Sequence, residues 1–250
     1  MNELRATIIR ALKDRLERDP GVHAAWLEGA DALARVDEFS DIDFCCSVDS
    51  VGLDGAVALA QEALLAIGPL DLVQRLDRPA NQRHVVFHLS EASPYLLVDF
   101  VAHEGTTGSR FIAGDEIEKP LVLFDRGGWV RFRSPEAEPA SLDLTRRLQD
   151  LRRTVSQASR VDKHIRRGEF LEAFGYYQKW LLEPLITCLR LRCTPLHSDY
   201  SIVHISRHLP AAEVRRLEEL FQVRSMEELK RKSREAIRFF EEAAREIERG

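Results

Sequence analysis

The sequence predicts an α+β protein, in which an N-terminal domain with a mixed sheet flanked by helices precedes a C-terminal α-helical bundle. Three observations predict this architecture. Strand-like and helix-like segments alternate in the first half, a Pro-, Ser- and Glu-rich stretch over residues 132–143 is typical of a linker, and helical periodicity fills the remainder. We therefore place one domain at residues 1–135 and a second at residues 136–250.

The N-terminal half begins with an amphipathic helix over residues 3–18, where Leu4, Ile8, Leu12 and Leu16 recur at four-residue spacing. Short apolar runs bounded by turn residues then indicate strands. The further elements that we expect are strands at residues 22–29, 42–48, 70–76, 83–90 and 95–104 and a helix at residues 55–68. The last strand is apolar on both sides of Asp99, which predicts a central, buried position in the sheet.

The C-terminal half is helical in pattern. Apolar residues recur at three- and four-residue spacing from Leu144 onward, and residues 168–193 are apolar enough around their circumference to form a central helix. Pro184 should kink or interrupt that helix because proline has no N–H to donate. Ser225 and Glu228 form a capping box that opens a last amphipathic helix.

Composition narrows the class of protein. The 250 residues are 44% hydrophobic and 31% charged, as in ordinary globular proteins. The net charge of −5 argues against a general nucleic-acid binder, which is usually basic. The four cysteines show neither a disulfide framework nor zinc-ligand spacing. Without a signal-peptide pattern or a long apolar run, we expect a soluble, cytoplasmic protein with no membrane partner.

The pair Asp41 and Asp43 is the most informative feature. Residues at i and i+2 of a strand point to the same face, so both carboxylates share one side of the sheet. Like charges this close are costly unless a cation lies between them, and Mg²⁺ is the natural candidate. Gly29, just upstream, would let the backbone approach a phosphate group, and Asp99 would add a third carboxylate.

Residues 29–44, GADALARVDEFSDIDF, resemble the signature of the polymerase-beta-like nucleotidyltransferases, in which a glycine turn precedes an Asp-x-Asp pair on the next strand. The helical half is similar to that of the antibiotic nucleotidyltransferases, which modify aminoglycosides or lincosamides. The resemblance covers the N-terminal domain by motif and the C-terminal half by helical character alone.

The resemblance implies Mg²⁺-dependent transfer of a nucleoside monophosphate, AMP from ATP, to a hydroxyl of a small-molecule acceptor such as an antibiotic. Asp41 and Asp43 would bind Mg²⁺, and Asp99 would share a second metal ion or act as general base. The nucleotide-binding candidates are Gly29, Ala30, Ser40 and Lys179. For Lys179 the alternative is an ordinary surface lysine beside core tyrosines. The oligomeric state stays open, with a homodimer paired through the helical bundles as one option.

Two alanines depart from the family pattern. Ala30 replaces the usual serine after the glycine, and Ala34 replaces a second common glycine. Loss of the serine hydroxyl removes one charge-assisted hydrogen bond to the triphosphate, worth about 1.5–3 kcal/mol. The alternatives are therefore a degenerate, non-catalytic nucleotide-binding copy, or nucleotidylation of a protein or RNA partner.

Overall fold

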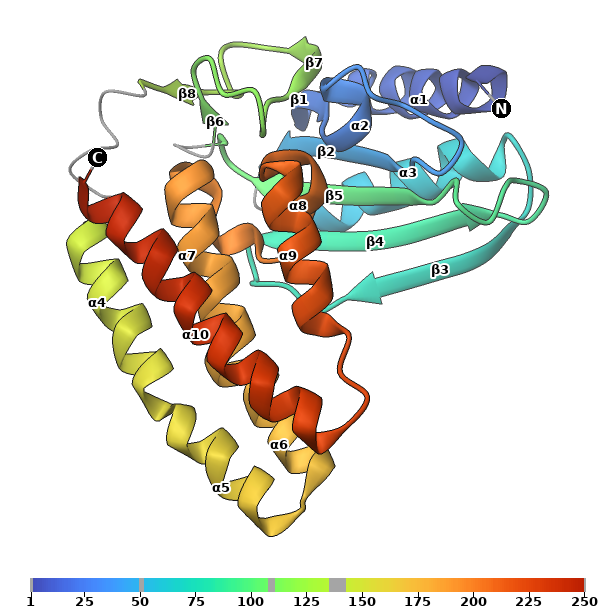
Figure 1. Cartoon of the computed structure of the whole chain (residues 1–250). Helices are drawn as coiled ribbons and strands as arrows, with labels where there is room; N and C mark the ends of the chain where they lie inside the picture. The colour runs from blue at the N-terminus through green and yellow to red at the C-terminus, as the bar shows by residue number, and fades with distance from the viewer. Residues whose placement is uncertain (1, 50–51, 108–110, 135–142, 250) are drawn as a thin grey trace. The chain divides into compact units, whose positions relative to one another are not determined.

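The computed structural model describes residues 2–49, 52–107, 111–134 and 143–249, and its fold is α+β (Figure 1). The chain divides into two units, residues 1–137 and 138–250. The first unit contains the sheets and their flanking helices, and the second is helical.

A six-stranded mixed sheet with the order β3-β4-β5-β2-β1-β7 forms the frame of the N-terminal unit (Figure 1). Strands β2 and β5 are parallel, and the other neighbouring pairs are antiparallel. A separate pair, β6 and β8, is parallel. The strands are β1 (Val22–Leu27), β2 (Ile42–Val48), β3 (Leu70–Leu76), β4 (Gln82–Leu89), β5 (Val98–Glu104), β6 (Phe111–Ile112), β7 (Leu121–Asp125) and β8 (Phe132–Arg133).

One face of this sheet is packed against α1 (Asn2–Glu17) and α3 (Leu53–Leu65). The apolar stripe of α1, which includes Leu12, joins the same core as Ile42, Phe44 and Phe100. Because side chains alternate along a strand, the residues between these core positions on β2 and β5 point to the opposite face. That second face carries the acidic residues predicted from the sequence.

A smaller apolar cluster lies on the second face. Trp26 and Cys45 pack there against Phe111 and Val130, beyond the acidic end of the strands. This cluster covers part of the face with β6 and the segment before β8.

The predicted elements of the N-terminal half are present, with shifted ends. The helix expected at 55–68 is α3, which ends at Leu65, before Gly68. The central position predicted for the Asp99 strand is confirmed, since β5 lies between β4 and β2. The sequence did not predict the one-turn helix α2 (Gly29–Ala32) or the strands β6, β7 and β8. The helix α2 and the strands β6 and β8 have two to four residues, so periodicity leaves no clear signal in them. Strand β7 has five residues, which is an ordinary strand length.

The C-terminal unit has its own apolar core, which includes Leu185, Leu189, Phe239 and Phe240. The long α10 packs against α7, α5 and α6. The helices are α4 (Leu144–Val155), η2 (Ser156–Ala158), α5 (Ser159–Arg167), α6 (Phe170–Tyr177), η3 (Gln178–Leu182), α7 (Glu183–Cys193), η4 (Pro195–Tyr200), α8 (Ile205–His208), α9 (Ala211–Phe221) and α10 (Met226–Arg249).

Pro184 marks a change of helix geometry and not a break, because α6, η3 and α7 are contiguous and the residues at their junctions keep helical backbone angles. The five residues of η3 form a π-helical turn immediately before it, and α7 begins with the proline in its first turn. A wider turn accommodates a residue that cannot donate an N–H to the preceding turn. At the start of α10, the Ser225 hydroxyl accepts the N–H of Glu228 at 3.2 Å, as the capping box predicts. The Glu228 carboxylate accepts the N–H of Arg224 instead of that of Ser225.

Residues 135–142 of the predicted linker lie outside the described residues. Within the described part of the chain, no helix combines the length and apolar character needed to cross a bilayer. Cys45, Cys46, Cys188 and Cys193 form no disulfide bond in the described structure, and the first three are buried.

Replacement of Phe100 by alanine should lower the free energy of unfolding by about 3–5 kcal/mol. Its ring is fully buried and lies 6.0 Å from that of Phe44 and 6.5 Å from that of Phe87, measured between centroids. Urea denaturation followed by circular dichroism measures the loss. The control is Val73→Ala on the same sheet, where a side chain that is 46% exposed should cost less than about 1 kcal/mol. Equal losses would contradict this account of the core.

Candidate functional site

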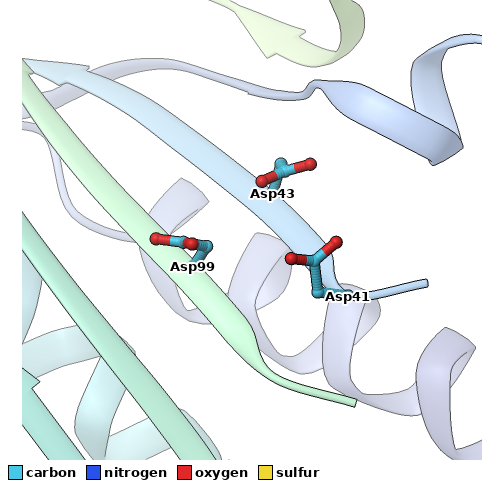
Figure 2. Close-up of side chains that lie close together, drawn as sticks. All are labelled: Asp41, Asp43 and Asp99. Carbon is cyan, nitrogen blue, oxygen red and sulfur yellow. The ribbon is translucent and has the colours of Figure 1, made fainter. Parts of the chain in front are cut away.

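The three predicted aspartates lie together on the second face of the sheet (Figure 2). One carboxylate oxygen from each of Asp41, Asp43 and Asp99 lies within 4.8 Å of those of the other two. The parallel pairing of β2 with β5 places Asp43 directly beside Asp99, and Asp41 precedes Asp43 by two residues. All three side chains are half-buried. The sheet therefore gathers three acidic groups at one partly shielded point.

The acidic groups disturb one another's ionisation. Burial, followed by the charges of Asp41, Asp99, Glu28 and Asp31, raises the pKa of Asp43 to about 7. Burial also raises the pKa of Asp41, and a backbone hydrogen bond and the charge of Arg5 partly offset it. Without a bound cation, the cluster holds a proton near neutral pH. A divalent cation would remove this repulsion and favour the ionised forms.

Arg5, from helix α1, holds the loop that leads to the cluster. Its buried guanidinium pairs with Asp31 and donates to the main-chain carbonyls of Ser40, at 2.9 Å, and Asp41. Because three separate acceptors surround one buried cation, the loop and the backbone of Asp41 are fixed relative to the sheet. Periodicity predicted the helix but gave no sign of this role, since Arg5 lies 36 residues before Asp41.

Gly29 occupies a position where a side chain would be strained. Its φ angle is +55°, in the left-handed region, and a Cβ atom built there would lie 2.0 Å from Oδ2 of Asp43. The N–H of Glu28 also donates to the carbonyl of Asp43 at 3.0 Å. The turn after β1 thus places its main chain directly against the Asp43 carboxylate. Phosphate binding by this turn stays a prediction.

A cleft of about 410 Å³ opens over the carboxylates of Asp43 and Asp99, within the N-terminal unit. Glu28 stands near Asp43 and accepts a hydrogen bond from the Trp26 indole at 2.7 Å. The residues that line the cleft are Glu28, Asp43, Cys45, Arg78, Pro79, Gln82, His84, Asp99 and Val101. Its floor is therefore acidic, and its basic members come from β4 and the segment before it.

His84 is a member of the site that the sequence did not reveal. Its imidazole contacts the Asp99 carboxylate from β4, and the Arg78 guanidinium contacts the other side of the ring. Once β4 is known to pair with β5, His84 shares a face with Asp99. The alternation of side chains along a strand places His84 on one face of β4. The sequence does not show which strand pairs with β4.

The remaining predicted residues occupy different surroundings. Ala30 lies in α2, with its carbonyl accepting the N–H of Arg35 at 2.9 Å. The Ser40 hydroxyl bonds to Asp37 within the loop. Lys179 belongs to η3 of the C-terminal unit, where its Nζ lies 5.3 Å from the ring centroid of Trp180. Nucleotide contacts by these three residues stay predictions.

Ala34 keeps the backbone conformation that favours glycine. Its φ angle is +53°, so the position where the resembled signature has a second glycine still turns through the left-handed region. Alanine thus adopts here a left-handed backbone conformation that glycine adopts more easily.

The donor set suits Mg²⁺. Three carboxylates supply hard oxygen ligands, and the described residues place no ion-paired cation on Asp41 or Asp43, whose charges are crowded. Mg²⁺ is typically held by one or two protein carboxylates together with substrate phosphates, and the cleft above the cluster leaves room for such a substrate.

No protein-family model matches the sequence, and no curated protein matches it significantly. Among solved structures, the chain is similar to an aminoglycoside 6-adenyltransferase from Bacillus subtilis, with 12% sequence identity. The match covers 97% of this chain and 88% of the other, with a TM-score of 0.39. A TM-score this low gives no support for a function. The evidence for a function is therefore the geometry of the site.

Gly29→Ala should weaken binding of Mn²⁺, used as a probe for Mg²⁺, by at least about tenfold. The new Cβ would meet Oδ2 of Asp43 and force that carboxylate out of place. Electron paramagnetic resonance of free Mn²⁺ measures the affinity. The matched control is Gly105→Ala, where φ is also positive at +79° but no atom lies within 4 Å of the added Cβ. If both variants bind Mn²⁺ alike, the close approach of Gly29 to Asp43 has no role in the site.

Asp43→Asn should stabilise the metal-free protein at about pH 8 by roughly 1–3 kcal/mol. This range is smaller than the pKa shift alone would give, because the Asp43 carboxylate is partly exposed and solvent screens its charge. The native pKa of about 7 lies above the ordinary value of 3.8, so between these values the folded state holds more protons than the unfolded state. The wild type therefore loses stability as pH rises from about 4 to 7, and asparagine avoids that loss.

Chemical denaturation across this pH range, without metal, tests the sign. The advantage of the asparagine variant should fade toward pH 4, and saturating Mg²⁺ should reverse it by stabilising only the wild type. An advantage that does not change with pH would contradict the raised pKa of Asp43.

Proposed function

We propose that this protein is a Mg²⁺-dependent nucleotidyltransferase that moves AMP from ATP to a hydroxyl group of a small-molecule acceptor. One observation carries the proposal: Asp41, Asp43 and Asp99 present oxygens within 4.8 Å of one another beside a glycine turn that abuts Asp43. Three clustered carboxylates are the arrangement used for two-metal phosphoryl chemistry. The acceptor class suggested by the resemblance in the sequence is an aminoglycoside- or lincosamide-like antibiotic.

Each residue of the cluster has a role in this proposal. Asp41 and Asp43 hold Mg²⁺, which when bound supplies positive charge to the triphosphate. The main chain of the turn at Gly29 lies beside Asp43, where backbone N–H groups can receive phosphate oxygens. Asp99 either binds a second metal ion or accepts the proton of the acceptor hydroxyl. Both roles require its carboxylate to face the Asp41–Asp43 pair.

The transfer itself needs positioning more than covalent help from the protein. The acceptor oxygen attacks the α-phosphorus, the bond to the bridging oxygen breaks, pyrophosphate leaves, and the hydroxyl proton passes to a base. The floor of the cleft aligns the two substrates over the carboxylates. Such alignment can contribute about 7–11 kcal/mol to lowering the barrier.

A second function has one observation in its favour. Ala30 offers no hydroxyl to a triphosphate, as expected of a nucleotide-binding protein that has lost catalysis. Against it stands the crowding of the carboxylates, which raises the pKa of Asp43 to about 7. A cluster of like charges with this effect is costly to keep in a protein with no use for a cation. We therefore favour the enzyme.

Isothermal titration calorimetry with a non-hydrolysable ATP analogue tests the proposal. The wild type should bind the analogue only with Mg²⁺ present, and Asp43→Asn should weaken that binding at least about tenfold because a metal ligand is lost. Asp14→Asn, at an exposed aspartate of α1, is the matched control and should bind as the wild type does.

The outcomes separate the functions. Mg²⁺-dependent binding followed by turnover with a hydroxyl acceptor supports the enzyme. Binding without turnover across an acceptor panel favours the non-catalytic protein. Failure to bind any nucleoside triphosphate would exclude both.

A further inference from the structure

A chain of three side chains crosses from the rim of the cleft to the acidic cluster. Nε of Arg78 lies 3.1 Å from Nδ1 of His84, and Nε2 of the same imidazole contacts Oδ1 of Asp99. Arg78 precedes β4, His84 lies on β4, and Asp99 lies on β5. All three line the same cleft.

The chemistry of the groups determines the direction of these hydrogen bonds. A guanidinium nitrogen can only donate, so Nδ1 of His84 must accept and carries no proton. The proton of the neutral imidazole is therefore on Nε2, which donates it to Oδ1 of Asp99. Arg78 thus selects the histidine tautomer that can hold the carboxylate.

The strand pairing explains why His84 reaches Asp99. In the antiparallel register of β4 and β5, His84 lies opposite Val101 and Val86 lies opposite Asp99, so His84 and Asp99 are diagonal neighbours on one face. The His84 side chain is 11% exposed and that of Asp99 is 30% exposed. Oδ1 therefore contacts the more buried of the two side chains, while the described residues offer Oδ2 no hydrogen-bond donor.

We propose that His84, oriented by Arg78, is a positioning residue that holds Asp99 by Oδ1 and so keeps the Asp99 carboxylate beside those of Asp41 and Asp43. This inference rests on the proposed function, because it concerns the orientation that either role of Asp99 requires. His84 acts through Asp99 and lies outside the candidate metal cluster, which among the described residues contains the three aspartates.

A second histidine–aspartate pair on β4 provides a matched control. Nδ1 of His88 lies 2.7 Å from Oδ1 of Asp71, and its Nε2 lies 3.0 Å from the carbonyl of Ser93. His88 lies four residues after His84 and does not line the cleft. If the His84 pair only stabilised the sheet, substitutions of the two histidines would have similar effects.

Nitrogen NMR of the imidazoles in the metal-free protein, at about pH 8, tests the hydrogen bonds directly. The wild type should show His84 with its proton on Nε2. Arg78→Met should populate the Nδ1-protonated tautomer, because the donor to Nδ1 has gone. A wild-type His84 protonated on Nδ1 would overturn the inference, whatever reaction the protein catalyses.

A double-mutant comparison of His84 and Asp99 tests the positioning role. Asp99→Asn should lower Mn²⁺ affinity if Asp99 is a ligand, or kcat if it is the base. His84→Leu should lower that same quantity about 10–100-fold, and should add no further loss in the Asp99→Asn background. His84→Gln, whose amide can donate in place of Nε2, should recover most of the loss. His88→Leu should leave the quantity unchanged.

Other results have distinct meanings. Equal losses in His84→Leu and His88→Leu, or fully additive losses with Asp99→Asn, would overturn the positioning role. A wild type that binds neither Mn²⁺ nor nucleotide would instead contradict the proposed function, and the NMR result would then decide the hydrogen-bonded chain by itself.

Discussion

The parallel pairing of β2 with β5 is the constraint on which the rest of the N-terminal unit depends. Its register sets Asp43 beside Asp99 on one face of the sheet, and the same register places Phe44 beside Phe100 in the core on the other. Since a shift of one residue would exchange the two faces, burial of the phenylalanines holds the aspartates where they are. The core and the acidic site are thus two consequences of one strand pairing.

Support for the cluster comes from outside these two strands. Arg5 holds the main chain of Asp41 from helix α1, Gly29 brings the turn after β1 against Asp43, and His84 contacts Asp99 from β4. Each of these contacts fixes one aspartate. Crowded carboxylates repel one another and would spread apart on a flexible support, so a site that gathers a cation needs this rigidity.

The sequence predicted most of the regular structure because its patterns are local. Four-residue spacing marked α1, and short apolar runs marked β1 to β5. It also predicted that Asp99 would lie in a central strand. The elements α2, β6 and β8 escaped prediction because two to four residues carry no periodicity. Strand β7 escaped prediction although its five residues have an ordinary strand length.

For the site, the sequence alone determined what depends on neighbours in the chain. Asp41 and Asp43 share a face because side chains alternate along a strand, and glycine at position 29 marks a turn that other residues would strain. Only the tertiary structure decided that Asp99 lies beside Asp43, that Arg5 holds the loop and that His84 contacts Asp99. These contacts join residues far apart in the chain, and strand order and register, which arise from packing of the whole sheet, bring them together.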